Sequence, residues 1–187
     1  MWFDALAASL ARDNLDLLAP PVAAAIAVIP EALVFSIDPA DADTATLAAK
    51  LALPLEASAN AVLVSGRRSG QERQACCLTL AHRRVDVNGE VRRRLDVRKA
   101  SFMPAATATT LSKMAYGGIT PIGLPADWPI WLDSQVTATD WVCVGAGNRS
   151  AKLIVPGPAL LRLPQAIMVE GLAYTPGPTA QDDGSEG

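Results

Sequence analysis

Two glycine-rich segments of the chain carry the residue types best suited to hold a polar ligand. The first, from Tyr116 to Gly123, reads Tyr-Gly-Gly-Ile-Thr-Pro-Ile-Gly. Paired glycines let main-chain N–H groups come close to a ligand, and Pro121 fixes one side of the turn. Amides that converge on one point form an oxyanion hole or a carbonyl-binding nest. The segment therefore predicts a carbonyl-binding loop, and a tight turn between two strands is the alternative.

The second segment runs from Gly145 to Lys152 and combines flexible backbone with positive charge. It contains Gly145 and Gly147, followed by Arg149 and Lys152. It lacks the third glycine of a dinucleotide-binding loop, and the residues after it are strand-like instead of helical, which disfavours a Rossmann-type site. Together with the first loop, this segment is suited to hold a polar substrate with a phosphate nearby.

The sequence contains few residues that could form a metal site or a catalytic triad. His82 is the only histidine and no Cys-x-x-Cys pair is present, so a zinc site has too few ligands. A Ser-His-Asp triad would also need His82, which is followed by two arginines and is typical of a surface residue. No Gly-x-Ser-x-Gly motif is present. We therefore expect neither a metal nor a cofactor.

Positive charge is concentrated in one part of the chain. Between Arg67 and Lys99 there are ten Lys or Arg residues and four acids, although the whole chain has a formal net charge of −3. Clustered cations favour an anionic partner, because they release condensed counterions when they bind nucleic-acid phosphates. The segment therefore indicates a nucleic-acid-binding face, with a solvated helix and strand edge as the alternative.

The cysteines and the N-terminal residues indicate where in the cell the protein is located. Cys76 and Cys77 are adjacent in an apolar run, and neighbouring side chains of a strand point to opposite faces, so we expect no disulfide between them. They and Cys143 are typical of small core residues in a reducing compartment. No basic segment precedes an apolar stretch near the N-terminus, and residues 22–29 are too short to cross a bilayer. We expect a cytoplasmic protein with no membrane partner.

Apolar periodicity and turn residues predict the elements that position the two loops. Strands and helices alternate irregularly, which argues against a doubly wound parallel sheet. We expect helices at Met1–Leu18, Asp41–Leu51, Val87–Leu95, Ala105–Met114 and Pro158–Leu163. We expect strands at Ala32–Ile37, Ala61–Ser65, Ala75–Leu80, Lys99–Met103, Ile130–Leu132, Trp141–Val144, Leu153–Val155 and Ile167–Val169.

These elements predict a single α/β (α+β) domain over residues 1–173. The expected core is a mixed, partly closed, barrel-like sheet of about six to eight strands surrounded by helices. Residues 174–187 are rich in Pro, Gly, Asp and Ser and are expected to form a disordered tail.

The two loops and the strand between them resemble one known family. Gly117-Gly-Ile-Thr-Pro-Ile-Gly123, a strand ending in Asp133, and Gly145-Ala-Gly-Asn-Arg-Ser-Ala-Lys152 are similar to the YbaK/ProX-type aminoacyl-tRNA editing family. That family includes free-standing deacylases and the domain inserted in bacterial prolyl-tRNA synthetases. The resemblance extends from Ile37 to Val169 and is most specific in its C-terminal third. It implies a barrel-like sheet and an activity that protects the fidelity of translation.

The resemblance also implies roles for individual residues. Backbone N–H groups of Gly117 and Gly118 would bind the ester carbonyl of a misacylated tRNA, while the terminal ribose hydroxyl helps a water to attack. A pocket near Ile119, Thr120 and Ile122 would select a small amino acid by size. The other substrate-binding residues would be Pro121, Gly123, Gly145, Gly147, Arg149 and Lys152, and tRNA phosphates would meet Arg83, Arg84, Arg92, Arg93 and Arg94.

Asn60 departs from the family pattern. The resemblance places a lysine here, at the opening of the strand after the first helix, with a part in substrate binding and deacylation. Asn60 can donate and accept hydrogen bonds but brings no positive charge. Asn60 is therefore a candidate catalytic residue with a reduced electrostatic contribution.

Three hypotheses for function follow. The first is trans-editing hydrolysis of a misacylated tRNA that carries a small amino acid. The second is a module of the same fold that binds aminoacyl-tRNA or a small ligand without hydrolysis, which Asn60 favours. The third is a structural or regulatory partner of an aminoacyl-tRNA synthetase. The expected partners are the acceptor end of tRNA and a synthetase, with no DNA partner.

Overall fold

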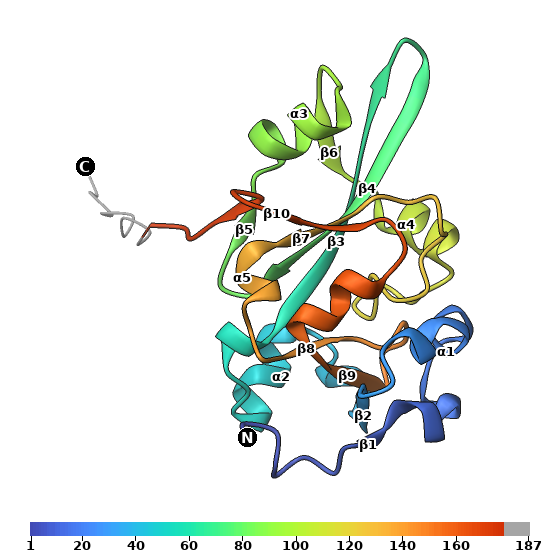
Figure 1. Ribbon diagram of the computed structural model, residues 1–187, viewed down its shortest axis with the longest axis vertical. Coiled ribbons are helices and arrows are strands. Elements are labelled where there is room, and N and C mark those ends of the chain that lie inside the picture. The colour runs from blue at the N-terminus through green and yellow to red at the C-terminus, as the bar shows by residue number, and fades with distance from the viewer. Residues whose placement is uncertain (178–187) are drawn as a thin grey trace, which may run out of the picture.

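The computed structural model describes residues 1–177, whose strands form three sheets (Figure 1). The five-stranded sheet has the order β10-β7-β4-β3-β6, the four-stranded sheet the order β1-β2-β9-β8, and β11 pairs with β5. The strands are β1 Ser9–Leu10, β2 Leu33–Ser36, β3 Ala59–Arg68, β4 Gln71–Leu80, β5 Arg84–Val85, β6 Ala100–Phe102, β7 Ile130–Asp133, β8 Trp141–Gly145, β9 Ala151–Pro156, β10 Ala166–Val169 and β11 Ala173–Tyr174.

The helices are short and start at recognisable residues. Helix α2 begins after Asp43, whose carboxylate accepts a hydrogen bond from the N–H of Ala45 at 3.0 Å and so caps the helix. In residues 1–177, no helix is long and apolar enough to cross a membrane. The α-helices are α1 Pro20–Ala25, α2 Thr44–Leu51, α3 Arg92–Leu95, α4 Ala105–Ser112 and α5 Ser134–Thr137.

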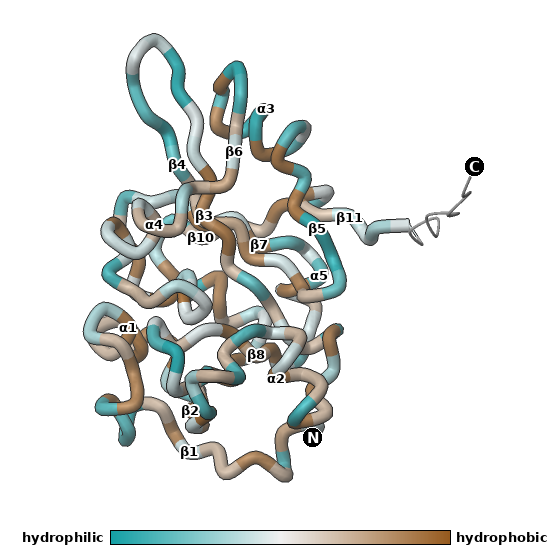
Figure 2. Tube along the Cα trace, turned by 180° about the vertical axis from the view of Figure 1, so that it is seen from behind, coloured by the Kyte–Doolittle hydropathy of each residue, from teal (hydrophilic) through white to brown (hydrophobic). Residues whose placement is uncertain are grey.

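Strands β3 and β4 form a long hairpin that projects from the molecule (Figure 1). Ser69 and Gly70 join them with φ of 51° and 81°, the conformation of a two-residue turn whose twist matches that of the strands. The half near Leu80 is buried and the half near the turn is exposed. Figure 2 shows the exposed half as mostly hydrophilic.

The five-stranded and four-stranded sheets share one core. A parallel bridge between Ser58 and Cys143 joins the start of β3 to β8. The largest buried cluster includes Leu78 and Leu132 from one sheet and Leu153 from the other. The predicted mixed α/β class is therefore confirmed. The strands of residues 1–177 form separate sheets and not one closed barrel, so the barrel-like detail is not confirmed.

The three cysteines are buried and unpaired by disulfides in the described part of the chain, as the sequence predicts for core residues. Burial raises the pKa of Cys76 and of Cys143 to about 12. Burial also raises the pKa of Cys77. These thiols stay protonated at neutral pH and serve as small core side chains.

The helix expected at Met1–Leu18 is wrong. This segment contains turns, strand β1 and two short 3₁₀ turns, and its apolar residues pack at separate places. Phe3 contacts the ring of Trp141 with centroids 5.3 Å apart, whereas Leu18 joins the main core. The first α-helix of the chain is α1, which begins at Pro20. Proline fits the first turn of a helix, because its missing N–H would have no partner there.

Smaller differences concern short elements. Residues 87–91 form a π-helical turn before α3, and the short helix expected at Pro158–Leu163 is a 3₁₀ helix at residues 157–162. Strands β5 and β11 and helix α5 are too short to give a sequence pattern. Tyr174, the first residue of the expected tail, pairs with Arg84, and residues 178–187 of that tail lie outside the described residues.

Candidate functional site

A pocket of about 680 Å³ opens between the N-terminal end of α2, strand β3 and the first glycine loop. This volume lies within the range of small-molecule sites. Three charged side chains belong to its wall, Asp43, Arg84 and Lys152. Small and apolar residues form much of the remainder, including Ala59, Ala61, Leu63, Met103 and Ala108.

Lys152 brings a buried positive charge to the pocket. It lies on β9 opposite Gly145 of β8, and it is 6% exposed. Its Nζ donates to the carbonyl oxygen of Ala42 at 3.0 Å and to that of Gly117 at 3.4 Å. No ion pair of Lys152 occurs within residues 1–177. Burial lowers the pKa of Lys152, because desolvation disfavours the charged form.

An ammonium group in this setting favours a particular kind of ligand. Its two partners are neutral carbonyls, so the cost of removing its charge from water is only partly offset. A ligand oxygen that carries or gains negative charge would supply the missing interaction. The pocket is therefore suited to an anion or to a carbonyl that becomes an oxyanion.

The two glycine loops pack directly against each other. The N–H of Gly147 donates to the carbonyl oxygen of Gly118 at 2.8 Å. A Cβ on Gly118 would lie 2.0 Å from the Asn148 oxygen, and a Cβ on Gly145 would lie 2.2 Å from the Gly118 oxygen. Only glycine permits this approach of the two backbones. The two loops therefore form one unit, as their combination in the sequence suggests.

The paired glycines of the first loop differ in their surroundings. Gly117 is exposed in the pocket wall, and its N–H makes no hydrogen bond within residues 1–177. Gly118 is buried, and its N–H donates to the carbonyl oxygen of Ala115 at 2.9 Å. Gly117 is therefore the glycine of this pair whose amide is available to a ligand.

The rest of the first loop lies partly in the pocket wall and partly behind it. Ile119 lines the pocket. Thr120, Pro121 and Ile122 are buried and lie outside its lining, and a Cβ on Gly123 would meet the backbone of α1. These four residues support the loop from the core side.

In the second loop, Gly147 and Arg149 also contact the first loop and other segments instead of lining the pocket. A Cβ on Gly147 would lie 2.5 Å from the side chain of Ala19. The Arg149 guanidinium donates to the carbonyl oxygens of Pro39 at 2.8 Å and Tyr116 at 3.3 Å. Arg149 therefore links the second loop to the turn at residues 39–41 that precedes α2, and to the first loop.

Asn60 lies in the pocket wall on β3. Its Oδ1 accepts a hydrogen bond from Thr44 Oγ1 at 2.6 Å, and its Nδ2 makes none within the described chain. Asn60 therefore offers amide N–H donors to the pocket. The positive charge expected on this strand instead comes from Lys152 on the other sheet.

Arg83 and Arg84 are adjacent but have different surroundings. Arg84 is exposed in the pocket wall and forms no ion pair in residues 1–177. The Arg83 Nε donates at 2.7 Å to the carboxylate of Asp133, which is fully buried, and its guanidinium also donates to the carbonyl oxygen of Ala173. Arg83 therefore holds β11 against the sheet, and its charge is largely neutralised.

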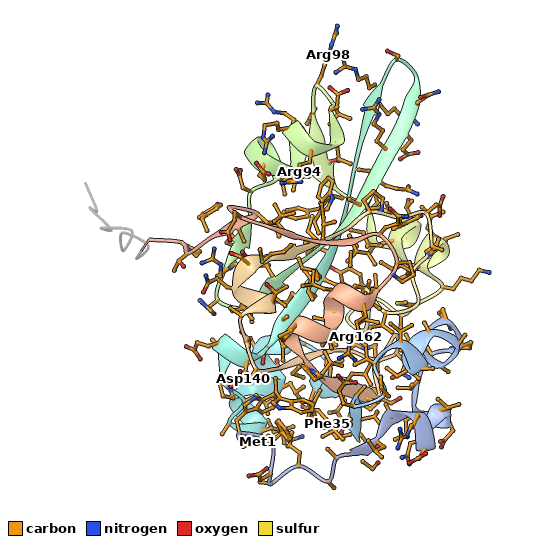
Figure 3. All side chains as sticks on the ribbon, in the orientation of Figure 1. Met1, Phe35, Arg94, Arg98, Asp140 and Arg162 are labelled. Atoms are coloured by element: carbon orange, nitrogen blue, oxygen red, sulfur yellow. The ribbon has the colours of Figure 1, made fainter. Side chains whose placement is uncertain are left out.

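The other basic residues between Arg67 and Lys99 lie in a projection that we call the basic arm, residues 66–74 and 87–99. Figure 3 places Arg94 and Arg98 at the end of the molecule where the β3–β4 hairpin projects. Several of its arginines form ion pairs: Arg93 and Arg94 with Glu90, and Arg68 and Arg73 with Asp96. Within the described residues, the exposed cations of the arm without an ion pair are Arg67, Arg92, Arg98 and Lys99.

Asp43 is a pocket residue that the sequence does not reveal. Asp43 belongs to the predicted helix Asp41–Leu51, where an acid at the start is ordinarily a capping residue. In the structure Asp43 caps α2 and also belongs to the pocket wall. The single histidine, His82, lies outside the wall. Residues 1–177 contain no cluster of His, Cys, Asp or Glu that could hold a metal ion.

The fold and pocket define a small α/β domain with a pocket between its sheets, and the sequence comparison identifies its family. The model of the aminoacyl-tRNA editing domain matches residues 38–163, which include every residue of the pocket wall. The chain belongs to the aminoacyl-tRNA editing domain family, and the resemblance read from its two glycine loops is confirmed. A comparison with curated protein sequences gave no match.

Solved structures share the fold at low sequence identity. A proposed trans-editing enzyme for prolyl-tRNA synthetase has a TM-score of 0.69 and 18% identity, over 81% of this chain and 94% of that one. A scaffold protein from a study of computational epitope grafting has a TM-score of 0.67 and 20% identity, over 85% and 97%. A proposed signal transduction protein from Marinobacter aquaeolei VT8 has a TM-score of 0.54 and 18% identity, over 82% of this chain and 30% of that one.

Proposed function

We propose that the chain binds the aminoacylated 3′ end of a misacylated tRNA and hydrolyses the ester bond of a small amino acid. The observation that carries this proposal is the buried ammonium of Lys152, which shares the pocket wall with the available amide of Gly117. Membership of the editing family supports the substrate class. The structural likeness to a proposed trans-editing enzyme supports the reaction.

The reaction needs no protein nucleophile, because the aminoacyl ester is already activated. A water molecule attacks the carbonyl carbon, and the carbonyl oxygen becomes an oxyanion. Lys152 Nζ and the Gly117 N–H stabilise that oxyanion, and loss of one such donor typically lowers the rate by roughly 10²–10³. The ester C–O bond then breaks. The ribose oxygen leaves with the proton that the water releases, which gives free amino acid and uncharged tRNA.

The amino acid side chain would lie against the apolar part of the pocket wall. Ile119 and the alanines at positions 59, 61 and 108 are the residues that limit its size. Each methylene that such a wall accepts or rejects changes binding by about 1–3 kcal/mol. Thr120 and Ile122 would act on this selection indirectly, because they support Ile119 from the core.

The remainder of the tRNA would lie along the basic arm. Arg84 at the pocket and the arm residues Arg92, Arg93 and Arg94 would contact phosphates of the acceptor end, with Arg83 fixing the nearby strand. A tRNA substrate also implies activity in the cytoplasm. A synthetase that docks on the same face is the alternative partner, and neutralising the arm would then leave tRNA affinity unchanged.

Asn60 favours a second candidate function, binding of aminoacyl-tRNA or a small aminoacyl ligand without hydrolysis. Asn60 carries no charge. Its Oδ1 already accepts a hydrogen bond from Thr44, so only its amide N–H groups are available to a ligand in the pocket. If Lys152 positions a ligand without stabilising an oxyanion, the pocket would retain its ligand intact.

A deacylation screen separates the two functions. Wild type and Asn60→Lys are incubated in parallel with tRNAs mischarged with small amino acids, and release of the amino acid is followed against protein-free controls. The proposed function predicts turnover of at least one substrate by wild type. Activity that appears only in Asn60→Lys supports the binding module, and no turnover by either protein contradicts hydrolysis.

A further inference from the structure

The pocket wall contains one acidic residue among the described positions, Asp43. Its Oδ1 accepts hydrogen bonds from the N–H groups of Ala45 at 3.0 Å and Thr46 at 3.1 Å, and from Thr46 Oγ1 at 3.3 Å. Its Oδ2 accepts none from residues 1–177. One carboxylate oxygen therefore fixes the side chain at the end of α2, and the other remains free.

Asp43 is ionised at neutral pH. The backbone hydrogen bond from Thr46 has the largest effect and lowers the pKa of Asp43, with smaller contributions from Ala45 and from the positive charge of Lys152. Within residues 1–177, Asp43 and Lys152 form no ion pair with each other. Both charges are therefore available to a ligand in the same pocket.

We propose that Asp43 binds the α-ammonium group of the aminoacyl ligand and so restricts the pocket to esters with a free α-amino group. This proposal rests on the proposed function, since it concerns the same pocket. An aminoacyl ester carries a positive charge next to its carbonyl, and that charge would be repelled by the buried ammonium of Lys152. An anion in the same wall removes this conflict. Lys152 then faces the carbonyl oxygen while Asp43 faces the ammonium.

The chain offers a variant that removes the charge of Asp43 without removing the helix cap. Asparagine caps helices as well as aspartate, so Asp43→Asn preserves the start of α2. Asp38→Asn is a matched control, because Asp38 caps the turn at residues 39–41 through the N–H of Ala40 and lies outside the pocket wall. Circular dichroism and thermal unfolding verify that both variants fold.

Binding of two non-hydrolysable analogues tests the proposal. 3′-Alanylamino-3′-deoxyadenosine carries the α-ammonium, and the 3′-propionylamino analogue lacks it without added bulk. Isothermal titration calorimetry should show that wild type and Asp38→Asn prefer the alanyl analogue by roughly tenfold or more, because a charge-assisted hydrogen bond is lost with the propionyl analogue. Asp43→Asn should lose this preference and bind the alanyl analogue no more tightly than the propionyl analogue.

The outcomes separate this proposal from the proposed function. Equal binding of both analogues by wild type, or a preference retained in Asp43→Asn, overturns the role of Asp43. A preference that Asp43→Asn abolishes supports that role even if wild type hydrolyses no mischarged tRNA. In that case hydrolysis is contradicted and the α-ammonium site stands.

Discussion

The pocket and the basic arm both carry positive charge, but they hold it in opposite ways. The pocket has one ammonium, Lys152, that is 6% exposed and bonded to neutral carbonyls. The arm has many exposed guanidinium groups, and some of them already pair with acids, as Arg93 does with Glu90. A buried charge interacts strongly with whatever enters its pocket, whereas exposed charges are screened by water and salt.

This difference assigns the two regions separate tasks. The pocket suits a chemical step, because the ammonium of Lys152 is buried and held in place. It can stabilise an oxyanion without a rearrangement of the surrounding groups. The arm suits attraction of a polyanion, since many weak contacts add up and respond to salt. Variants of the pocket should therefore change the rate constant and stability, and variants of the arm should change affinity.

The largest effect on stability is expected from Gly118→Ala. Its Cβ would lie 2.0 Å from the Asn148 oxygen, so the two glycine loops must move apart. We expect the free energy of unfolding to fall by about 3 kcal/mol, measured by urea denaturation, with loss of the pocket that both loops form. Gly171→Ala is the control, because a Cβ there meets nothing within 4 Å and only the φ of 70° opposes it. Equal losses in both variants would contradict the close packing of the loops.

A smaller effect of opposite sign is expected from Lys152→Met. Removing an incompletely compensated buried charge should raise the free energy of unfolding by about 1–2 kcal/mol at neutral pH.

The stability advantage of Lys152→Met should also depend on pH. The folded-state pKa of Lys152 is lowered by burial, with opposing effects from Cys143 and Asp43 and a further decrease from Arg149. The unfolded chain therefore binds more protons between that lowered pKa and 10.5, so the advantage of Met should shrink as pH rises through this window. Urea denaturation at several pH values measures this, and a variant less stable than wild type would show that Lys152 is a structural residue.

The smallest effect is expected from the arm. Arg92→Ala combined with Arg93→Ala should raise KM for tRNA roughly threefold to tenfold at low salt, and should flatten the log–log salt dependence by about 1.5, because two phosphate contacts are lost. The kcat should not change. Arg162→Ala is the control, since Arg162 pairs with Glu31 in another part of the molecule (Figure 3). An unchanged salt dependence in the double variant would indicate that the arm does not contact tRNA.

Much of the fold could be predicted from local patterns. The strands on either side of the polar segment 66–70 were identifiable from their apolar runs, although β3 continues through Arg68. Helix α2 was identifiable because acids precede its apolar face. The N-terminal segment could not be predicted in the same way. Its apolar spacing fits a helix, but Phe3 and Leu18 belong to different buried clusters, and only the tertiary structure decides this.

The site was predictable in its loops and not in its charges. The two glycine segments indicate close backbone approach, which the contact between Gly118 and Gly145 explains. The burial of Lys152 depends on the pairing of β8 with β9 and on the position of α2, and no local pattern encodes it. Asp43 has the sequence pattern of an ordinary cap, so its place in the pocket also required the structure.

The most direct test of the role of Lys152 is the single-turnover rate constant of ester hydrolysis for wild type, Lys152→Met and Lys113→Met. The substrate is the mischarged tRNA that wild type turns over fastest, and Lys113 is an exposed lysine outside the pocket wall. Lys152→Met should hydrolyse the ester roughly 10²–10³ times more slowly than wild type while remaining folded. Lys113→Met should match wild type. A Lys152→Met protein that hydrolyses the ester at the wild-type rate would contradict the role of the buried ammonium.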